Sequence, residues 1–158
     1  MGTTHKKVIV RKMDRDSISG YVAPAFLADG KVEVLNTAGS VVSVDLHEVK
    51  GVYFVRELGD SESIARKTFT SRPRTEGLWV RLRFRDNEVL EGMMPNDLLR
   101  DGNEGFSIIP PDSQSNTQRI FVPRSAVAEM TVLAVIGERK SQRRGRRPDD
   151  TRQTTMFM

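Results

Sequence analysis

The chain has 158 residues, of which 37% are hydrophobic, 25 are basic, 21 are acidic and none is cysteine. This length allows one domain or two very small ones, and the lack of cysteine excludes disulfides, thiolate metal sites and a cysteine nucleophile. No apolar run approaches the ~18–20 residues that span a bilayer, and residues 1–7 lack the apolar core of a secretory signal. We therefore expect a cytoplasmic protein without membrane contact.

The first half of the chain is rich in short strand patterns. Residues 7–13 alternate with period two, and a strand-like run at 17–22 contains Gly20, which indicates a bulge or sharp bend. Turn signals then separate three further runs, at 31–35, 41–44 and 49–56. Five short strands without a long helix predict an antiparallel meander or small barrel.

The pattern restarts after a connector that contains proline and glycine. Residues 78–84 alternate strictly, which predicts that Leu78, Val80, Leu82 and Phe84 face a core. Further strands are expected at 89–94, 105–109, 119–122 and 127–136.

The two halves can be superposed. A shift of 72 positions places Val8 on Val80, Val10 on Leu82 and Gly20 on Gly92. Beyond a longer loop at 110–118, a shift of 78 positions places residues 44–54 on 122–132. This order of matches favours an internal duplication, and the alternative is one irregular all-β domain.

The basic excess is confined to the end of the chain. Residues 137–158 hold seven basic and three acidic side chains, so residues 1–136 hold eighteen of each and are neutral. Because this segment is polar until its last residues, it cannot bury enough surface to offset its ordering entropy, and we expect it to be disordered. A neutral body argues against general nucleic-acid binding outside the tail.

Each half resembles an Sm-like barrel, the five-stranded fold of the Sm, LSm and Hfq proteins. The first Sm motif is similar to residues 80–86 followed by 90–92, and to residues 8–14 followed by 18–20. Residues 122–127 resemble the second motif, with Arg124 where the Hfq family has lysine, but Pro123 and Ser125 replace its aromatic residue and histidine. No acidic helix precedes either half, and the uridine-binding asparagine has no secure counterpart.

This resemblance implies an all-β chain with two similar five-stranded Sm-like barrels in tandem. They would occupy residues 7–57 and 78–136, joined by a connector at 58–77 and followed by a disordered basic tail at 137–158. The chain as a whole also resembles an uncharacterised bacterial protein family, which implies no activity.

One strand face is a candidate for nucleic-acid binding. Trp79, Arg81, Arg83 and Arg85 alternate along one strand, so guanidinium groups would follow a phosphodiester backbone beside a base-stacking ring. The Sm resemblance adds Arg124 to this surface. The alternative is a solvated face whose arginines pair with Glu88, Glu91 and neighbouring acids.

The connector offers a second candidate. Arg72, Arg74 and Thr75 would form an anion pocket between the halves, which makes the chain a sensor of an anionic small ligand or cyclic dinucleotide. The alternative is a plain linker. Residues 16–20 come near the cyclic-dinucleotide motif of PilZ domains, but the spacing differs and no RxxxR precedes them.

The tail carries two features of its own. Arg143, Arg144, Arg146 and Arg147 would neutralise DNA or RNA phosphates without sequence preference, unless they serve only to solubilise the tail. The last residues resemble the peptide that binds the bacterial DNA sliding clamp. That resemblance implies that Gln153 bonds the pocket rim and that Met156 and Phe157 fill the pocket. Thr154 departs from the preferred leucine, and the alternative is a tail end that packs on its own body.

Nothing in the sequence indicates catalysis. His5 and His47 lack a nearby nucleophile or ligand spacing, so we expect no enzyme activity, metal or cofactor. The preferred hypothesis is a nucleic-acid-associated adaptor whose C-terminal QTTMF peptide docks on a partner such as the sliding clamp. An Sm-like RNA-binding module and an anionic-ligand sensor are the alternatives. The oligomeric state and the choice between DNA and RNA stay open.

Overall fold

The computed structural model describes residues 5–59, 67–99, 104–112 and 114–137. This part of the chain is all-β, which confirms the expected fold class. Its strands are β1 (Lys6–Lys12), β2 (Ser17–Val22), β3 (Leu27–Ala28), β4 (Lys31–Asn36), β5 (Val41–Asp45), β6 (Val49–Val55), β7 (Gly77–Phe84), β8 (Val89–Met94), β9 (Gly105–Ile108), β10 (Thr117–Pro123) and β11 (Val127–Ile136). Single 3-10 turns, η1 (Leu46–Glu48) and η2 (Arg124–Ala126), precede β6 and β11.

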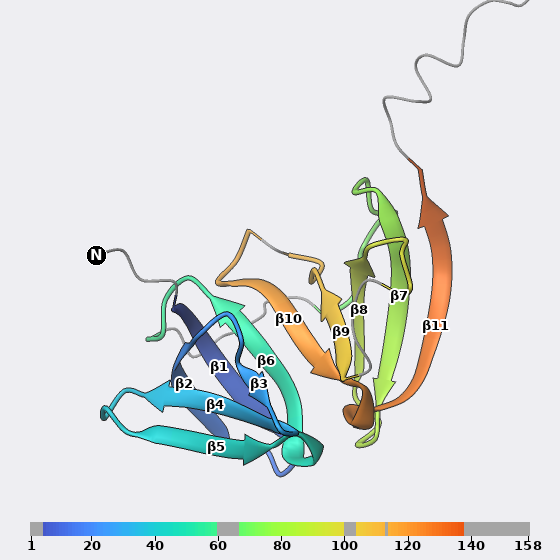
Figure 1. The fold of residues 1–158 in the computed structure, drawn as a ribbon. Helices are drawn as coiled ribbons and strands as arrows, with labels where there is room; N and C mark the ends of the chain where they lie inside the picture. Colours follow the sequence, from blue (N-terminus) through green and yellow to red (C-terminus); the bar gives the residue numbers. More distant parts are fainter. Residues whose placement is uncertain (1–4, 60–66, 100–103, 113, 138–158) are drawn as a thin grey trace, which may run out of the picture.

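The strands form two antiparallel sheets (Figure 1). In the larger sheet the order is β3-β4-β2-β1-β6-β10-β9, with β5 paired to β4, and the smaller sheet has the order β11-β7-β8. A single bridge between Met93 and Ile109 connects the two sheets beside β9. The larger sheet therefore crosses from the first half of the chain into the second through the β6–β10 pair.

The strand pairing of the described residues does not close either half into a barrel of its own. Both sheets are open: among the described residues, no ladder joins β5 to β6 or β10 to β11. Instead β10 pairs with β6, with Ile120 opposite Tyr53 and Phe121 opposite Val52. Two separate five-stranded barrels therefore remain a prediction.

The pairing registers of the two halves correspond position by position. Val8 lies opposite Gly20, as Val80 lies opposite Gly92. Likewise Val10 pairs with Val52, as Leu82 pairs with Met130, and in both ladders a register shift follows nearer to the 3-10 turn. The turns η1 and η2 are themselves 78 positions apart.

The glycines in β2 and β8 are required by close packing. A Cβ on Gly20 would lie 2.2 Å from the carbonyl oxygen of Leu35, and one on Gly92 would lie 2.0 Å from Cγ2 of Ile108. The neighbouring strand approaches both positions too closely for any side chain. The β1–β2 and β7–β8 ladders run through these glycines without a register shift, so a bulge at either position is not seen.

Two apolar clusters hold the body together, and each draws on both halves. Ile9 and Tyr53 pack with Leu82 and Ile120 in one cluster. Phe121 of β10 joins the valines of β1, β4 and β6 in the other, where Phe26 makes edge-to-face contacts with Phe54 and Phe121 at centroid distances of 5.6 Å. Burial of apolar side chains from β6 and β10 in these clusters holds the second half against the first.

Candidate functional site

The outer face of β7 holds the basic stripe that the alternation predicted. Leu78, Val80, Leu82 and Phe84 are buried, whereas Arg81 and Arg83 are exposed and Trp79 is half-buried. The side chains that β7 turns outward are therefore those expected. Their contacts decide what this face can bind.

Glu91 on β8 lies directly opposite Arg81 and is only 4% exposed. Its carboxylate accepts hydrogen bonds from the backbone N–H of Phe69 (3.0 Å), from Trp79 Nε1 (3.2 Å) and from Arg81 Nε and Nη2 (3.3 and 3.1 Å). Burial alone would raise the pKa of Glu91, but the hydrogen bonds from Phe69, Arg81 and Trp79 outweigh it and hold this pKa below its ordinary value. Glu91 is thus an ionised structural anchor for both Trp79 and Arg81.

Trp79 is held from a second side as well. The ring of Phe69 meets the indole edge-to-face, at a centroid distance of 5.8 Å and an interplanar angle of 78°. With its N–H bonded to Glu91 and its ring against Phe69, the indole is positioned by the chain itself.

The remaining arginines of the stripe also have partners within the chain. Arg83 pairs with Glu129 (3.4 Å) on β11 and donates to Asn87 Oδ1 (3.3 Å). Arg85 donates to the backbone carbonyls of Ser125 and of His47, the latter at 3.2 Å. A phosphate on this face would have to compete with carboxylates and carbonyls that already bind the arginines. The arginines of the stripe therefore mainly link neighbouring segments of the body.

Arg124 lies in η2, next to Ser125, whose carbonyl accepts from Arg85. Its guanidinium lies over the ring of Phe106, 5.0 Å from the centroid, and its backbone N–H donates to the carbonyl of Glu104 (2.7 Å).

A charged cluster that the sequence did not indicate joins the two halves. Lys50 of β6, only 9% exposed, donates to Asp86 (2.8 Å) and to Glu88, both at the β7–β8 turn. Lys67 also pairs with Glu88. Hydrogen bonds from Lys50 and Lys67 lower the pKa of Glu88. At Asp86 the effect of burial is outweighed by Lys50 and backbone donors, so its pKa is lowered too.

Tyr53 is a buried phenol in the apolar cluster that the two halves share. Burial raises its pKa to about 12, although Arg11, whose guanidinium lies 5.2 Å from the ring centroid, opposes this shift. A phenol that holds its proton this firmly is unsuited to general acid–base chemistry near neutral pH.

The three connector residues that the sequence singled out lie at the surface of the described part of the chain. Arg72, Arg74 and Thr75 are all exposed, while Pro73 between the two arginines is buried. The buried proline fixes the path of the connector against the body, and the arginines point their charge to solvent.

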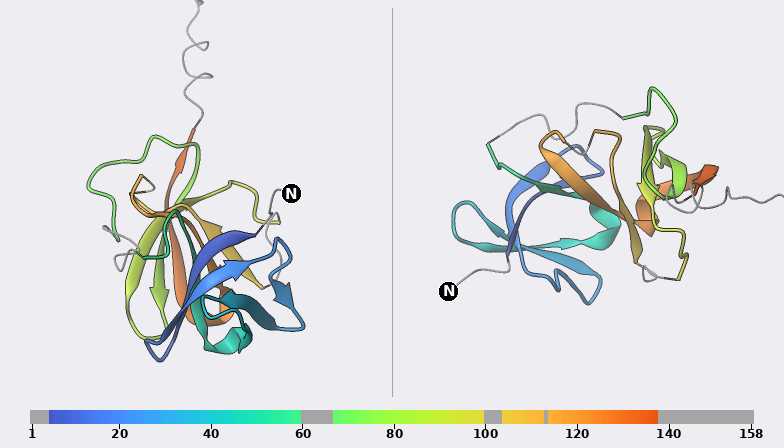
Figure 2. Two further views of the ribbon diagram at one scale, coloured as in Figure 1. Left: turned by 90° about the vertical axis from the view of Figure 1, so that its left-hand side faces the viewer. Right: turned by 90° about the horizontal axis from the view of Figure 1, so that it is seen from above.

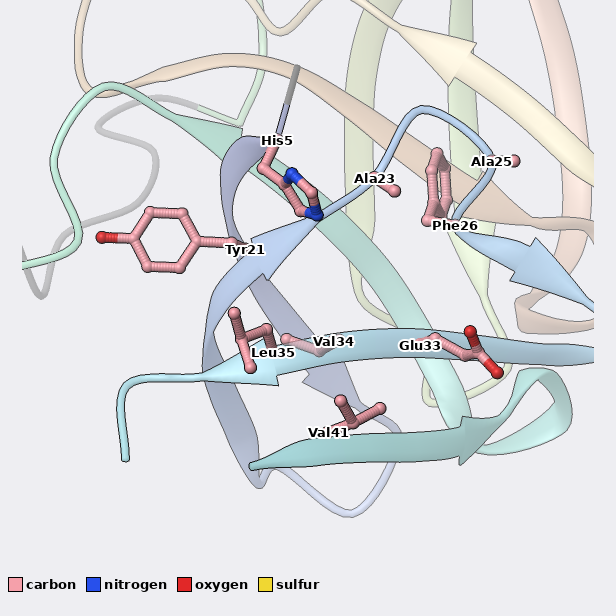
Figure 3. A pocket seen from close by; sticks show the side chains of 9 residues that line it. All are labelled: His5, Tyr21, Ala23, Ala25, Phe26, Glu33, Val34, Leu35 and Val41. Atoms are coloured by element: carbon pink, nitrogen blue, oxygen red, sulfur yellow. The ribbon is translucent and has the colours of Figure 1, made fainter. Parts of the chain in front are cut away.

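A small apolar pocket lies on the first half, where β2 and β4 separate (Figure 3). Its volume is about 130 Å³, and it is lined by His5, Tyr21, Ala23, Ala25, Phe26, Glu33, Val34, Leu35 and Val41. The Tyr21 hydroxyl points away from the other lining side chains. This volume is below the roughly 300–1,000 Å³ of ordinary metabolite sites, so the pocket suits an apolar side chain better than a nucleotide.

Several predicted residues lie outside the described part of the chain. These are the tail arginines Arg143, Arg144, Arg146 and Arg147 and the terminal residues Gln153, Met156 and Phe157. Within the described ranges, no group of three or more histidine, aspartate and glutamate side chains is arranged to hold a metal ion. Nor does this part of the chain contain a helix with the length and apolarity needed to cross a bilayer.

Sequence analysis gave Glu91 as a partner of the arginines only in its alternative interpretation, and it missed both the bonds of Glu91 to Phe69 and Trp79 and the Lys50 cluster. The Arg81–Glu91 pair could be predicted from the sequence. The turn between β7 and β8 sets the pairing register of this hairpin, and that register places Arg81 opposite Glu91. The Lys50 cluster carried no such signal, since its members come from different halves.

Comparison with known proteins places the chain in a family. The model of a family of unknown function, DUF6982, matches residues 4–134, and the chain belongs to this family. No curated protein and no solved structure matches the sequence or the fold.

Proposed function

We propose that this member of the DUF6982 family is a non-catalytic, nucleic-acid-associated adaptor, whose C-terminal peptide docks on a partner such as the DNA sliding clamp. The observation that carries the proposal is a contrast in charge. Arginines on the body, Arg81 and Arg83, are paired with Glu91 and Glu129, whereas the net charge of +4 resides in residues 137–158. This contrast in charge supports nucleic-acid binding by the tail.

The basic segment follows the last strand of the body directly in the sequence. β11 ends at Ile136, and the next residues are the first of the basic segment. The segment carries clustered arginines for loose phosphate contact and ends in Gln153, Met156 and Phe157. Burial of a Met and a Phe side chain in a partner pocket contributes about 1.5–3 kcal/mol each before ordering costs.

We further propose that the body consists of two copies of one Sm-like unit. The matching registers of β1–β2 with β7–β8, and of β1–β6 with β7–β11, support this proposal. The arginine stripe differs between the copies, because β1 carries Ile9 and Arg11 where β7 carries Arg81 and Arg83. RNA binding on the β7 face is the less favoured function, because its cations are already paired.

Fluorescence polarisation of a labelled peptide of residues 149–158 against purified sliding clamp tests the docking step. The matched control is the same peptide with Met156→Ala and Phe157→Ala. We expect saturable binding of the native peptide and none of the control. Absence of binding at about 100 µM clamp, which corresponds to a free energy weaker than about −5.5 kcal/mol, rejects docking on the clamp.

A second experiment separates the tail from the body. The full chain and a chain ending at Ile136 are compared for retention of single-stranded oligonucleotides at low and moderate salt. We expect retention by the full chain only, with a steep salt dependence. Equal retention by the shortened chain would move nucleic-acid binding to the body and favour the RNA-binding alternative.

A further inference from the structure

The pocket on the first half lies where the chain passes from β2 to β3. β2 pairs with β4 only at Gly20 and Tyr21, and the chain then runs through residues 23–26 before β3 pairs with β4 further along. This departure from the sheet leaves the pocket of about 130 Å³ beside β4 (Figure 3). The irregular pairing of β2 therefore creates the pocket.

The wall of this pocket suits one aromatic ring. Phe26 lines it, together with the cross-strand neighbours Leu35 and Val41, which are 39% and 69% exposed. The volume is close to the roughly 150 Å³ of an apolar cavity that holds one benzene ring. A cavity of this size with exposed apolar side chains around it is suited to bind an apolar side chain.

The pocket also carries a negative charge. Its lining residues include one carboxylate, that of Glu33, and neither lysine nor arginine. Figure 3 shows Glu33 at the opposite end of the pocket from Tyr21. An apolar side chain that is accompanied by a cation therefore complements this pocket.

Residues 152–158 have these properties. Outside the described ranges the sequence holds one aromatic side chain, Phe157, which lies between Met156 and Met158. Arg152 lies five positions earlier, and five residues span at most about 17 Å. This segment therefore supplies an aromatic ring and a nearby cation.

The segment is long enough to reach the pocket. Figures 1 and 2 show β4 and the last residues of β11 on opposite sides of the body. A folded body of about 130 residues has a radius of gyration of about 14 Å and is roughly 40 Å across. Phe157 is 21 positions beyond Ile136, and a chain of that length spans up to about 70 Å. Phe157 can thus reach the far side of the body without any displacement of β11.

We propose that Phe157 occupies this pocket of its own chain whenever no partner binds it, with Arg152 beside Glu33. Phe157 is also a residue that the proposed function assigns to the sliding clamp, and one side chain cannot fill both sites. The regulatory role of the contact therefore rests on the proposed function, whereas the contact itself needs no partner. A partner binds only the fraction of chains in which Phe157 is released.

The size of this effect follows from the effective concentration of Phe157. One docked side chain gives a dissociation constant on the order of 0.1–1 mM between separate molecules. A flexible linker raises the local concentration of the attached group to about 1 mM, so the pocket is filled in about 50–90% of chains. The full chain should accordingly bind the clamp about 2–10-fold more weakly than a chain whose pocket is blocked.

Disulfide trapping in the full chain tests the contact without any partner. The chain contains no cysteine, so Val41→Cys with Met158→Cys places one thiol at the pocket and one beside Phe157. Val135→Cys with Met158→Cys is the matched control, because Val135 is also exposed and lies only 23 positions before Met158. We expect mild oxidation to link the Val41 pair within one chain several-fold faster than the Val135 pair.

Addition of Phe157→Ala to the Val41 pair separates docking from chance encounter. This variant should react at the rate of the Val135 control. Equal rates for the Val41 and Val135 pairs, or no effect of Phe157→Ala, would overturn the contact. A disulfide that joins two chains assigns the pocket to Phe157 of a second copy and likewise overturns the proposal for a single chain.

Binding to purified clamp tests the regulatory role. Fluorescence polarisation compares the labelled full chain with Val41→Asp, which places a charge at the pocket, and with Val135→Asp as the control, and circular dichroism verifies that each is folded. We expect Val41→Asp to bind the clamp about 2–10-fold more tightly and Val135→Asp to match the unmodified chain. Equal affinities of all three refute the regulation. Failure of the isolated peptide of residues 149–158 to bind the clamp rejects the docking function and its regulation, while the trapping result still decides the pocket contact.

Discussion

Removal of the buried carboxylate of Glu91 is expected to destabilise the body more than any other single change on its outer face. In a Glu91→Ala chain the backbone N–H of Phe69 and the indole N–H of Trp79 lose their acceptor. Arg81 loses an ion pair but is half-exposed and regains water. Hydrogen bonds to a charged acceptor contribute about 1.5–3 kcal/mol each when buried, so after this rehydration we expect a loss of about 2–4 kcal/mol.

Thermal unfolding followed by circular dichroism measures this effect. At about 3–4 °C per kcal/mol for a chain of this size, the melting temperature should fall by about 10 °C. Glu129→Ala, which removes the exposed partner of Arg83, is the matched control and should cost less than about 1 kcal/mol. Equal effects of the two substitutions would refute the role of Glu91 as an anchor.

The pH dependence gives an independent check on the same residue. The pKa of Glu91 lies below its ordinary value of 4.5 in the folded chain. Its stabilising contribution is therefore complete above that ordinary value and is lost as the pH falls toward the folded pKa. Glu91→Gln should flatten this part of the stability profile, and an unchanged acid slope in that variant would contradict the assignment.

Two further substitutions test the packing and the contact between the halves. Gly92→Ala should destabilise the body by about 1–3 kcal/mol in urea unfolding, because the new Cβ would lie 2.0 Å from Ile108 Cγ2, and a neutral result would refute the close approach. Lys50→Ala should raise the pKa of Glu88, measured by carboxyl NMR, because Lys50 donates to it, although Lys67 retains part of the effect. An unchanged pKa of Glu88 would show that Lys50 does not hold it.

The sequence was sufficient for local structure because strand alternation is a local signal. It correctly placed Leu78, Val80, Leu82 and Phe84 in the core. It also raised the alternative that the arginines pair with acids, which describes Arg81 and Glu91. Glu88, however, pairs with lysines instead.

The contacts between the halves were beyond reach of the sequence. Pairing of β6 with β10 joins residues more than 60 positions apart, and nothing in the alternation of either strand distinguishes this partner from β5 or β11. Lys50 with Asp86 follows from the same long-range arrangement. Exposure of Arg72 and Arg74 likewise depends on how Pro73 packs on the body, which spacing does not determine.

Affinity capture from lysate tests most directly whether binding resides in the C-terminal peptide. Three forms are compared: the full chain, a chain ending at Ile136, and the full chain with Met156→Ala and Phe157→Ala. The adaptor proposal predicts that the sliding clamp is recovered with the full chain and lost from both altered forms. Recovery of the same partners by all three would contradict it and return the binding surface to the folded body.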